Sequence, residues 1–251
     1  MRIKIGELIL LLSKEESYLL EVSDKDFHTK SGVIRLGEII GKNYGEKIKT
    51  HLGKEFTLVE PNIVDILERR IERMAQVILP KDISLIITTT GVSADSLVVD
   101  AGTGSGYTAI FLANYVKPRK VVTYEIDKRF IKLAEENIEK SGLKKYIKLK
   151  KKDVMKGIDE KNVDLVTLDM KGVEKVVKHA YKVLKPGGWL VVYSPNIEQV
   201  TSVHREIVKK NFCDVKTIEN IVREWQVKKY TRPKTMGIMH TGFLTFARKV
   251  G

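Results

Sequence analysis

Four acidic residues follow apolar runs that are typical of buried β-strands. Asp100 follows the run at 97–99, Glu125 the run at 121–124, Asp153 a run that ends at 150, and Asp169 the run at 163–168. In an open α/β sheet the ligand lies across the carboxyl ends of the strands. Carboxylates at that edge can accept hydrogen bonds from ribose hydroxyls or from an adenine amino group. The pattern therefore predicts a nucleoside-binding edge, with Glu125 on a ribose and Asp153 near the base.

Each of these roles has a simpler alternative. Glu125 suits the ribose of NAD as well as that of another nucleoside. Asp153 follows three lysines at 150–152 and could be a solvated charge that neutralises them. Asp169 could be no more than a strand-end cap. One acidic strand end is common, and four in succession favour a site.

The first apolar run leads into a glycine-rich turn, DAGTGSG at 100–106. Gly102, Gly104 and Gly106 allow close backbone approach to a ligand, and the helix-compatible run at 107–117 would present free N–H groups. A dinucleotide fingerprint reads GxGxxG and faces a pyrophosphate, whereas this turn reads GxGxG. A carboxylate, Asp100, precedes its first glycine by two residues, which suits a cationic ligand better than a diphosphate. NAD and a turn that binds nothing are the alternatives.

The segments around this turn predict an α/β fold. From residue 97 onward, strand-like and helix-like runs alternate, as in a parallel sheet with helices on both faces. Segments 215–227 and 242–248 are expected to close the sheet as an antiparallel pair. Residues 1–60 alternate short apolar runs with turns and predict a small β module. Residues 61–77 predict a linking helix that Pro61 opens, so the domains expected are 1–60 and 61–251.

The composition points to a polyanionic partner. The chain has 45 basic and 32 acidic residues and a net charge of +13, and clustered Lys and Arg favour nucleic acids through counterion release. Heat adaptation is the alternative reading, although it would enrich charges of both signs. No apolar run approaches the roughly 20 residues of a membrane span, and residues 1–12 lack signal-peptide architecture. We therefore expect a cytoplasmic protein.

Metal and disulfide chemistry are not expected. Cys213 is the single cysteine, which excludes an internal disulfide framework and a cysteine-based zinc site. No pair of histidines has metal-ligand spacing with a carboxylate, so no metal is predicted.

The glycine-rich turn resembles motif I of the Rossmann-like S-adenosyl-L-methionine-dependent methyltransferases, whose ligand is a sulfonium without phosphate. Most of the chain is similar to the tRNA adenine-N1 methyltransferases that act on the T-loop. The motifs that carry this similarity are FHTKSG at 27–32, LPKDISLII at 79–87, YEID at 124–127, LKPGGWLVVYSP at 184–195 and RPKTMGIMHTGFLTFARK at 232–249. The resemblance implies a seven-stranded sheet, methyl transfer to N1 of adenine 58 and in archaeal-type members also 57, and a homotetramer.

The resemblance also implies roles for single residues. It places a set of residues on S-adenosyl-L-methionine: Asp100, Gly102, Thr103, Gly104, Ser105, Gly106, Glu125, Ile126, Asp153 and Val154. Asp169 takes the catalytic position, and Leu79, Lys171, Arg232 and His240 are expected on the side of the target base. Adenine N1 is already a nucleophile, so we expect Asp169 to orient the base through its exocyclic amine more than to act as a strong base.

Two positions depart from the family pattern. Met170 and Lys171 stand where Leu-Pro is typical, and Leu79 stands where a tyrosine or histidine is common. The first departure affects the loop after Asp169, and the second removes a ring that could stack on adenine. The alternatives are therefore a methyltransferase with a protein or small-molecule acceptor, or a non-catalytic tRNA-binding paralogue.

Overall fold

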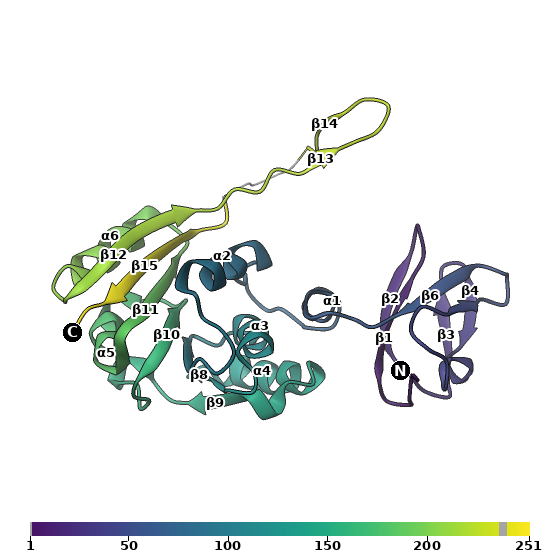
Figure 1. Cartoon of the computed structure of the whole chain (residues 1–251), viewed down its shortest axis with the longest axis horizontal. Helices are drawn as coiled ribbons and strands as arrows, with labels where there is room; N and C mark the ends of the chain where they lie inside the picture. The colour runs from purple at the N-terminus through teal and green to yellow at the C-terminus, as the bar shows by residue number, and fades with distance from the viewer. Residues whose placement is uncertain (1, 236–239) are drawn as a thin grey trace. The chain divides into compact units, whose positions relative to one another are not determined.

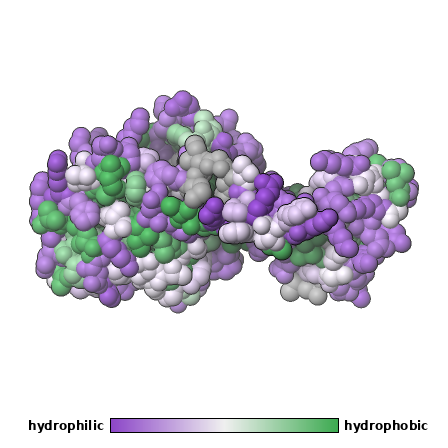
Figure 2. Space-filling view, turned by 90° about the horizontal axis from the view of Figure 1, so that it is seen from above, coloured by the Kyte–Doolittle hydropathy of each residue, from purple (hydrophilic) through white to green (hydrophobic). Residues whose placement is uncertain are grey.

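The computed structural model describes residues 2–235 and 240–251. The chain divides into two compact units, Met1–Ile71 and Glu72–Gly251 (Figure 1). Within the described residues, no helix is long and apolar enough to cross a membrane. Hydrophilic side chains cover most of the surface seen in Figure 2.

The first unit is a small antiparallel β module. Its four-stranded sheet has the order β2-β1-β6-β5, and β3 and β4 form a separate hairpin. These strands are β1 (Leu8–Leu12), β2 (Ser17–Glu21), β3 (Asp26–Thr29), β4 (Gly32–Arg35), β5 (Lys47–Lys49) and β6 (Glu55–Val59), with a 3-10 turn η1 (Leu36–Ile39). Alternate residues such as Ile9, Leu11, Phe56 and Leu58 are fully buried, because successive side chains of a strand point to opposite faces.

A short helix, α1 (Ile63–Arg69), completes the first unit. Asn62 accepts hydrogen bonds from the N–H groups of Val64 and Asp65, and the Asp65 side chain accepts the N–H of Asn62, which forms a capping box. The helix is shorter than the expected 61–77. It ends early because the N–H and C=O of Glu72 are hydrogen bonded to the Asn137 side chain instead of to helical partners.

The second unit is an α/β layer structure, as expected. Its seven-stranded sheet has the order β12-β15-β11-β10-β7-β8-β9. The strands are β7 (Val98–Ala101), β8 (Val121–Glu125), β9 (Ile147–Lys151), β10 (Val163–Leu168), β11 (Leu184–Ser194), β12 (Phe212–Glu219) and β15 (Phe243–Lys249). β15 runs antiparallel to its neighbours β11 and β12, which confirms the closing pair. Residues after Glu219 leave the sheet. The first strand of the pair, β12, therefore covers 212–219 instead of the predicted 215–227.

The helices lie on both faces because the order of the strands reverses at β7. The chain passes from β7 to β8 and β9 in one direction, and from β10 to β11 in the other. Right-handed crossovers therefore place α3 and α4 on one face and α5 on the opposite face. The helices of this unit are α2 (Pro80–Thr90), α3 (Tyr107–Val116), α4 (Lys128–Lys140), α5 (Val177–Val183) and α6 (Ile197–Ile207), with 3-10 turns η2 (Lys144–Tyr146), η3 (Val154–Lys156) and η4 (Val173–Val176).

A two-stranded hairpin extends beyond the sheet between β12 and β15 (Figure 1). It contains β13 (Trp225–Gln226) and β14 (Arg232–Pro233). We call residues 220–235 the arm. Part of the motif at 232–249, residues 236–239, lies outside the described residues.

Candidate active site

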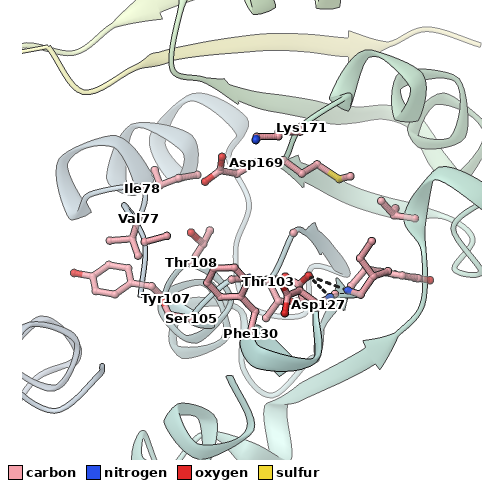
Figure 3. Close-up of a pocket in the computed structure, with 18 of the residues that line it drawn as sticks. Val77, Ile78, Thr103, Ser105, Tyr107, Thr108, Asp127, Phe130, Asp169 and Lys171 are labelled. Atoms are coloured by element: carbon pink, nitrogen blue, oxygen red, sulfur yellow. Dashed lines mark hydrogen bonds between the residues drawn. The ribbon is translucent and has the colours of Figure 1, made fainter. Parts of the chain in front are cut away.

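A cavity of about 620 Å³ lies at the carboxyl ends of β7, β8, β9 and β10 (Figure 3). This is the edge where the strand order reverses, the usual position of a ligand in such sheets. Ten residues named from the sequence line it: Gly102, Thr103, Gly104, Ser105, Glu125, Ile126, Asp153, Val154, Asp169 and Lys171. The predicted strand-end residues are thus brought together, with the exceptions described below.

The glycine-rich turn forms one wall of the cavity. Gly104 has φ +55°, and a Cβ at this position would have no neighbour within 4 Å, so its backbone faces open space. Gly106 does not line the cavity. A Cβ there would lie 3.7 Å from Ala134 and Ile138 of α4, so this glycine permits close packing of the turn on that helix.

Glu125 fastens the turn to the end of the next strand. Its Oε2 accepts the N–H of Gly104 at 2.9 Å, and its Oε1 accepts those of Ile126 and Asp127 at 2.8 and 3.0 Å. A carboxylate has about four acceptor positions. Three of these positions are occupied, so one remains, on Oε2, for a hydroxyl of a ribose in the cavity.

Asp100 is placed differently from the expectation that it contacts a ligand. Its two oxygens accept the hydroxyls of Thr123 and Thr167 at 2.7 Å each, and these threonines lie in register with it on β8 and β10. The side chain is buried within the sheet and does not line the cavity. Burial raises the pKa of Asp100 to about 6, against the opposing effect of the two hydroxyls. Asp100 therefore holds the strands on which the turn rests.

Asp153 caps the short turn η3 after the third strand. Its Oδ1 accepts the N–H of Met155 at 2.9 Å. Val154 and Met155 of the same turn line the cavity together with Phe130 of α4. These three apolar side chains beside one carboxylate form a surface suited to a planar base that carries an amino group.

Asp169 lies at the other end of the cavity, near Ile78 and Lys171 in Figure 3. Its backbone continues the β7–β10 pairing: its N–H donates to the carbonyl of Ala101 at 2.6 Å, and the N–H of Gly102 donates to its own carbonyl at 3.3 Å. Burial raises the pKa of Asp169 to about 7, and the negative charge of Asp100 adds to this shift. An acidic group with such a pKa in a cleft is typical of a functional residue.

The loop after Asp169 carries the unusual pair Met170 and Lys171. Both residues line the cavity, and the carbonyl of Met170 accepts the side-chain amide of Gln199 at 3.2 Å. Gln199 of α6 also lines the cavity, and sequence reasoning did not identify it. The lysine adds a positive charge to the end of the cavity that holds Asp169.

Residues 75–78 form a further wall, and 75–77 belong to the predicted linking helix at 61–77. Asn137 of α4 is fully buried and holds the chain just before this wall. It binds the backbone of Glu72 twice, at 2.9 and 3.1 Å, and donates to the carbonyl of Ser105 at 2.8 Å. A single asparagine thus joins Glu72, three residues before this wall, to the glycine-rich turn. The signal in the sequence was weak, since one polar residue on the apolar face of an amphipathic helix has many explanations.

Three residues expected near the target base do not line the cavity. Leu79 precedes α2 and follows the lining residue Ile78. Arg232 lies in the arm, in β14. His240 pairs with Glu219 at 2.6 Å and lies 3.3 Å from the carbonyl of Pro195, which does line the cavity. The hydrogen bond to Glu219 raises the pKa of His240.

The cavity fits S-adenosyl-L-methionine in volume and in chemistry. Its volume is within the range of small-molecule sites, and the open backbone at Gly104 would admit the amino acid portion. The hydroxyl of Ser105 is buried without a hydrogen-bond partner among the described residues. No group of three metal-ligating side chains occurs within 2–235 and 240–251.

Comparison with known families identifies the chain. Residues 65–238 match the model of the tRNA methyltransferase complex GCD14 subunit. The chain belongs to this family. The matched range of this chain contains the glycine-rich turn, Glu125, Asp153 and Asp169.

Curated relatives extend over nearly the whole chain. The tRNA (adenine(57)-N(1)/adenine(58)-N(1))-methyltransferase of Methanocaldococcus jannaschii is 37% identical, over 96% of this chain and 94% of the relative. The tRNA (adenine(58)-N(1))-methyltransferase of Thermus thermophilus is 29% identical, over 97% of each chain. Both similarities include the N-terminal β module, which the GCD14 family match does not reach.

Solved structures share the complete fold. The tRNA (m1A58) methyltransferase of Aquifex aeolicus superposes with a TM-score of 0.83 at 26% identity and covers 100% of both chains. A Thermotoga maritima protein described as a SAM-dependent O-methyltransferase superposes with a TM-score of 0.89 at 31% identity, over 100% of this chain and 95% of that one. These matches confirm the Rossmann-like methyltransferase fold for this member of the GCD14 family.

Proposed function

We propose that this protein is an S-adenosyl-L-methionine-dependent tRNA methyltransferase that modifies N1 of adenine 58 in the T-loop, and also adenine 57. Family membership supports the reaction class. The observation that carries the proposal is Asp169 at the end of the cavity, opposite the wall formed by Asp127 and Phe130. The cofactor-binding turn and the acceptor side therefore meet in one cavity.

S-adenosyl-L-methionine supplies an electrophilic methyl group on a sulfonium. Glu125 would hold its ribose hydroxyls, Asp153 its adenine amino group, and the backbone at Gly104 its amino acid portion. These contacts would hold S-adenosyl-L-methionine in the cavity, whose acceptor side contains Asp169. The cofactor residues are thus proposed on geometry, with Asp100 and Gly106 acting through the strands and helix that they position.

Asp169 would orient the target adenine. Its carboxylate can accept a hydrogen bond from the exocyclic amine, which places the N1 lone pair toward the methyl group. The bond from N1 to carbon forms as the bond from sulfur to carbon breaks, and the adenine ring gains a positive charge. A nearby carboxylate stabilises this charge. A base must leave the tRNA core to reach such a cavity.

The charge of the protein suits this substrate. A net charge of +13 favours binding to phosphates, and Lys171 lies beside Asp169, where a phosphate next to an extruded base could be held. We include Lys171 among the substrate-binding residues. Arg232 and His240 are proposed to contact tRNA outside the cavity.

The first experiment is transfer of labelled methyl from S-adenosyl-L-methionine to an unmodified tRNA transcript, with the modified position mapped by reverse-transcription stops. The proposal expects stops in the T-loop, and their loss in a transcript with guanine at position 58 and 57. Transfer to a small molecule or protein with none to tRNA would favour the other acceptor classes. Cofactor binding without any transfer would favour a non-catalytic paralogue.

We also propose that the protein assembles as a homotetramer through its arm. The arm exposes apolar side chains that a monomer would leave in water: Ile221, Val222, Trp225, Val227 and Tyr230. Burial of such side chains against a second copy is favourable. Light scattering should show a tetramer for the native protein and a smaller species for Val227→Lys. Val208→Lys changes a similarly exposed valine just after α6, outside the arm, and should not change the mass. An unchanged mass for Val227→Lys would refute the role of the arm.

A further inference from the structure

An ion pair lies at the base of the arm. Lys81 and Asp82 lie in the first turn of α2, and the Lys81 Nζ lies 2.8 and 2.9 Å from the two carboxylate oxygens of Asp82. Asp82 is only 1% exposed, and the Lys81 side chain is 18% exposed. Two charges so far out of water need complete hydrogen bonding.

The remaining partners of this pair are Asn220, the first residue of the arm, and Thr241, just before β15. The Lys81 ammonium donates to the carbonyl of Asn220, where the chain leaves β12, at 2.5 Å. It also donates to the hydroxyl of Thr241, just before β15, at 2.8 Å. That hydroxyl donates in turn to Asp82 at 3.1 Å, and the Asn220 amide returns a bond to the Lys81 carbonyl at 2.8 Å. The pair therefore fastens Asn220, the first residue of the arm, and Thr241, just before β15, to α2.

The end of β11 completes this base. The Tyr193 hydroxyl donates to the carbonyl of Thr241. Gly242 lies against the ring so closely that a Cβ there would overlap it. Pro195, two residues after Tyr193, lines the cavity. The base of the arm is thus continuous with the part of the sheet that borders the cavity.

The other side of the pair leads directly to the cavity. α2 begins at Pro80, and residues 75–78 immediately before it line the cavity. Figure 3 shows Ile78 next to Asp169. A shift at the first turn of α2 would therefore move the wall that faces Asp169, whereas Gly104 and Glu125 are held by separate bonds.

We propose that Lys81 is a positioning residue, which ties the base of the arm to the wall of the cavity facing Asp169 and so shapes the acceptor side of the site. Apolar residues of similar volume often stabilise a fold as well as a buried ion pair does. The charged pair adds directional hydrogen bonds that fix the positions of Asn220 and Thr241 relative to α2. The effect on methyl transfer rests on the function proposed above, and the effect on the cavity wall does not.

The first test measures the wall without any substrate. Thr241→Val removes one hydroxyl between the arm and the ion pair and leaves both charges in place. Hydrogen exchange should become at least about fivefold faster in peptides covering 77–84 and stay unchanged in peptides covering 102–106. Thr201→Val is the matched control, because that hydroxyl bonds only within α6. Unchanged exchange at 77–84 in Thr241→Val would overturn the proposal.

The second test separates positioning from general stability. Lys81→Met should lower kcat/KM for tRNA about tenfold or more, with affinity for S-adenosylhomocysteine within about twofold of native, and Lys81→Arg should recover part of the loss. Lys178→Met is a control at an exposed lysine of α5. Equal losses of tRNA and cofactor binding would overturn the proposal. If Lys81→Met does not fold, kcat/KM for tRNA and affinity for S-adenosylhomocysteine are measured on Thr241→Val instead. If the native protein modifies no tRNA, the proposed function fails, while the exchange measurement still decides the present inference.

Discussion

The N–H of Gly104 donates to Oε2 of Glu125 at 2.9 Å, which joins the glycine-rich turn to the end of the neighbouring strand. The same carboxylate accepts two further N–H groups on its other oxygen. One side chain thus shapes the turn and remains available to a ligand. Its removal should affect cofactor binding more than folding.

Glu125→Gln should weaken S-adenosylhomocysteine binding about tenfold or more, because the amide nitrogen cannot accept the N–H groups or hydroxyls that the lost oxygen accepted. Isothermal titration calorimetry measures this change. Glu135→Gln, at a half-exposed glutamate of α4 that pairs with Lys151, should bind normally. Native affinity in Glu125→Gln would exclude a role for this carboxylate in the cofactor site.

Asp169→Asn should lower kcat for tRNA methylation by about 100-fold or more, because the amide loses the charge that stabilises the cationic product ring. Affinity for S-adenosylhomocysteine should stay within about twofold. Single-turnover methyl transfer measures the first effect and calorimetry the second. Asp214→Asn, at an exposed position in β12, serves as the control. Full activity in Asp169→Asn would show that the assigned role is wrong.

The pH profile should report Asp169. Its pKa is raised to about 7, so the ionised form that accepts the exocyclic amine accumulates as the pH rises through about 7. We expect kcat/KM for S-adenosyl-L-methionine to increase from about pH 5.5 and level off above about pH 8. A bound sulfonium favours the carboxylate, so the kcat profile should lie at lower pH than the kcat/KM profile. The residual activity of Asp169→Asn should lack this rise; an identical rise there would assign it to another group.

Asp100 should make stability depend on pH. Its pKa in the folded protein is about 6, above the ordinary value of 3.8, so the folded state binds more protons between these values and loses stability as the pH rises through them. Asp100→Asn removes this dependence. The free energy of unfolding of Asp100→Asn relative to native should therefore rise between about pH 4 and about pH 7, by at most about 3 kcal/mol. Urea unfolding at a series of pH values measures it, and a constant difference would contradict the assignment.

Gly242→Ala should destabilise the second unit, because its Cβ would overlap the Tyr193 ring. We expect a loss of about 1–3 kcal/mol, typical of overpacking. Gly37→Ala, where a Cβ would meet its nearest neighbour at 3.9 Å, should be nearly neutral. Combining Gly242→Ala with Tyr193→Leu should cost less than the sum of the two single changes. Thermal unfolding of the four variants tests this coupling.

The order of the elements, and the edge at which the acids gather, could be predicted from the amino-acid sequence. Strand-like runs that end in Glu125 and Asp169, and a GxGxG turn between a strand and a helix, require only local patterns and the geometry common to parallel sheets. The small β module could also be predicted, from short apolar runs that alternate with turns. The domain boundary near residue 61 stays a prediction, while the contacts divide the chain after Ile71.

Which of these side chains face the cavity depends on how the strands pair in the folded protein. Asp100 lies inside its strand, and register with Thr123 and Thr167 supplies the hydroxyls that hold it within the sheet. A threonine in each of two apolar runs was a visible signal, but pairing partners depend on strand order, which no local pattern specifies.

The wall at 75–78 and the ion pair of Lys81 and Asp82 were beyond sequence reasoning for a similar reason. The segment follows a helical pattern, yet the Asn137 side chain takes the hydrogen bonds of Glu72 that a longer helix would need. The partners of Lys81 lie 139 and 160 residues away along the chain. Contacts between such distant residues arise only when the folded sheet brings its edges and helices together.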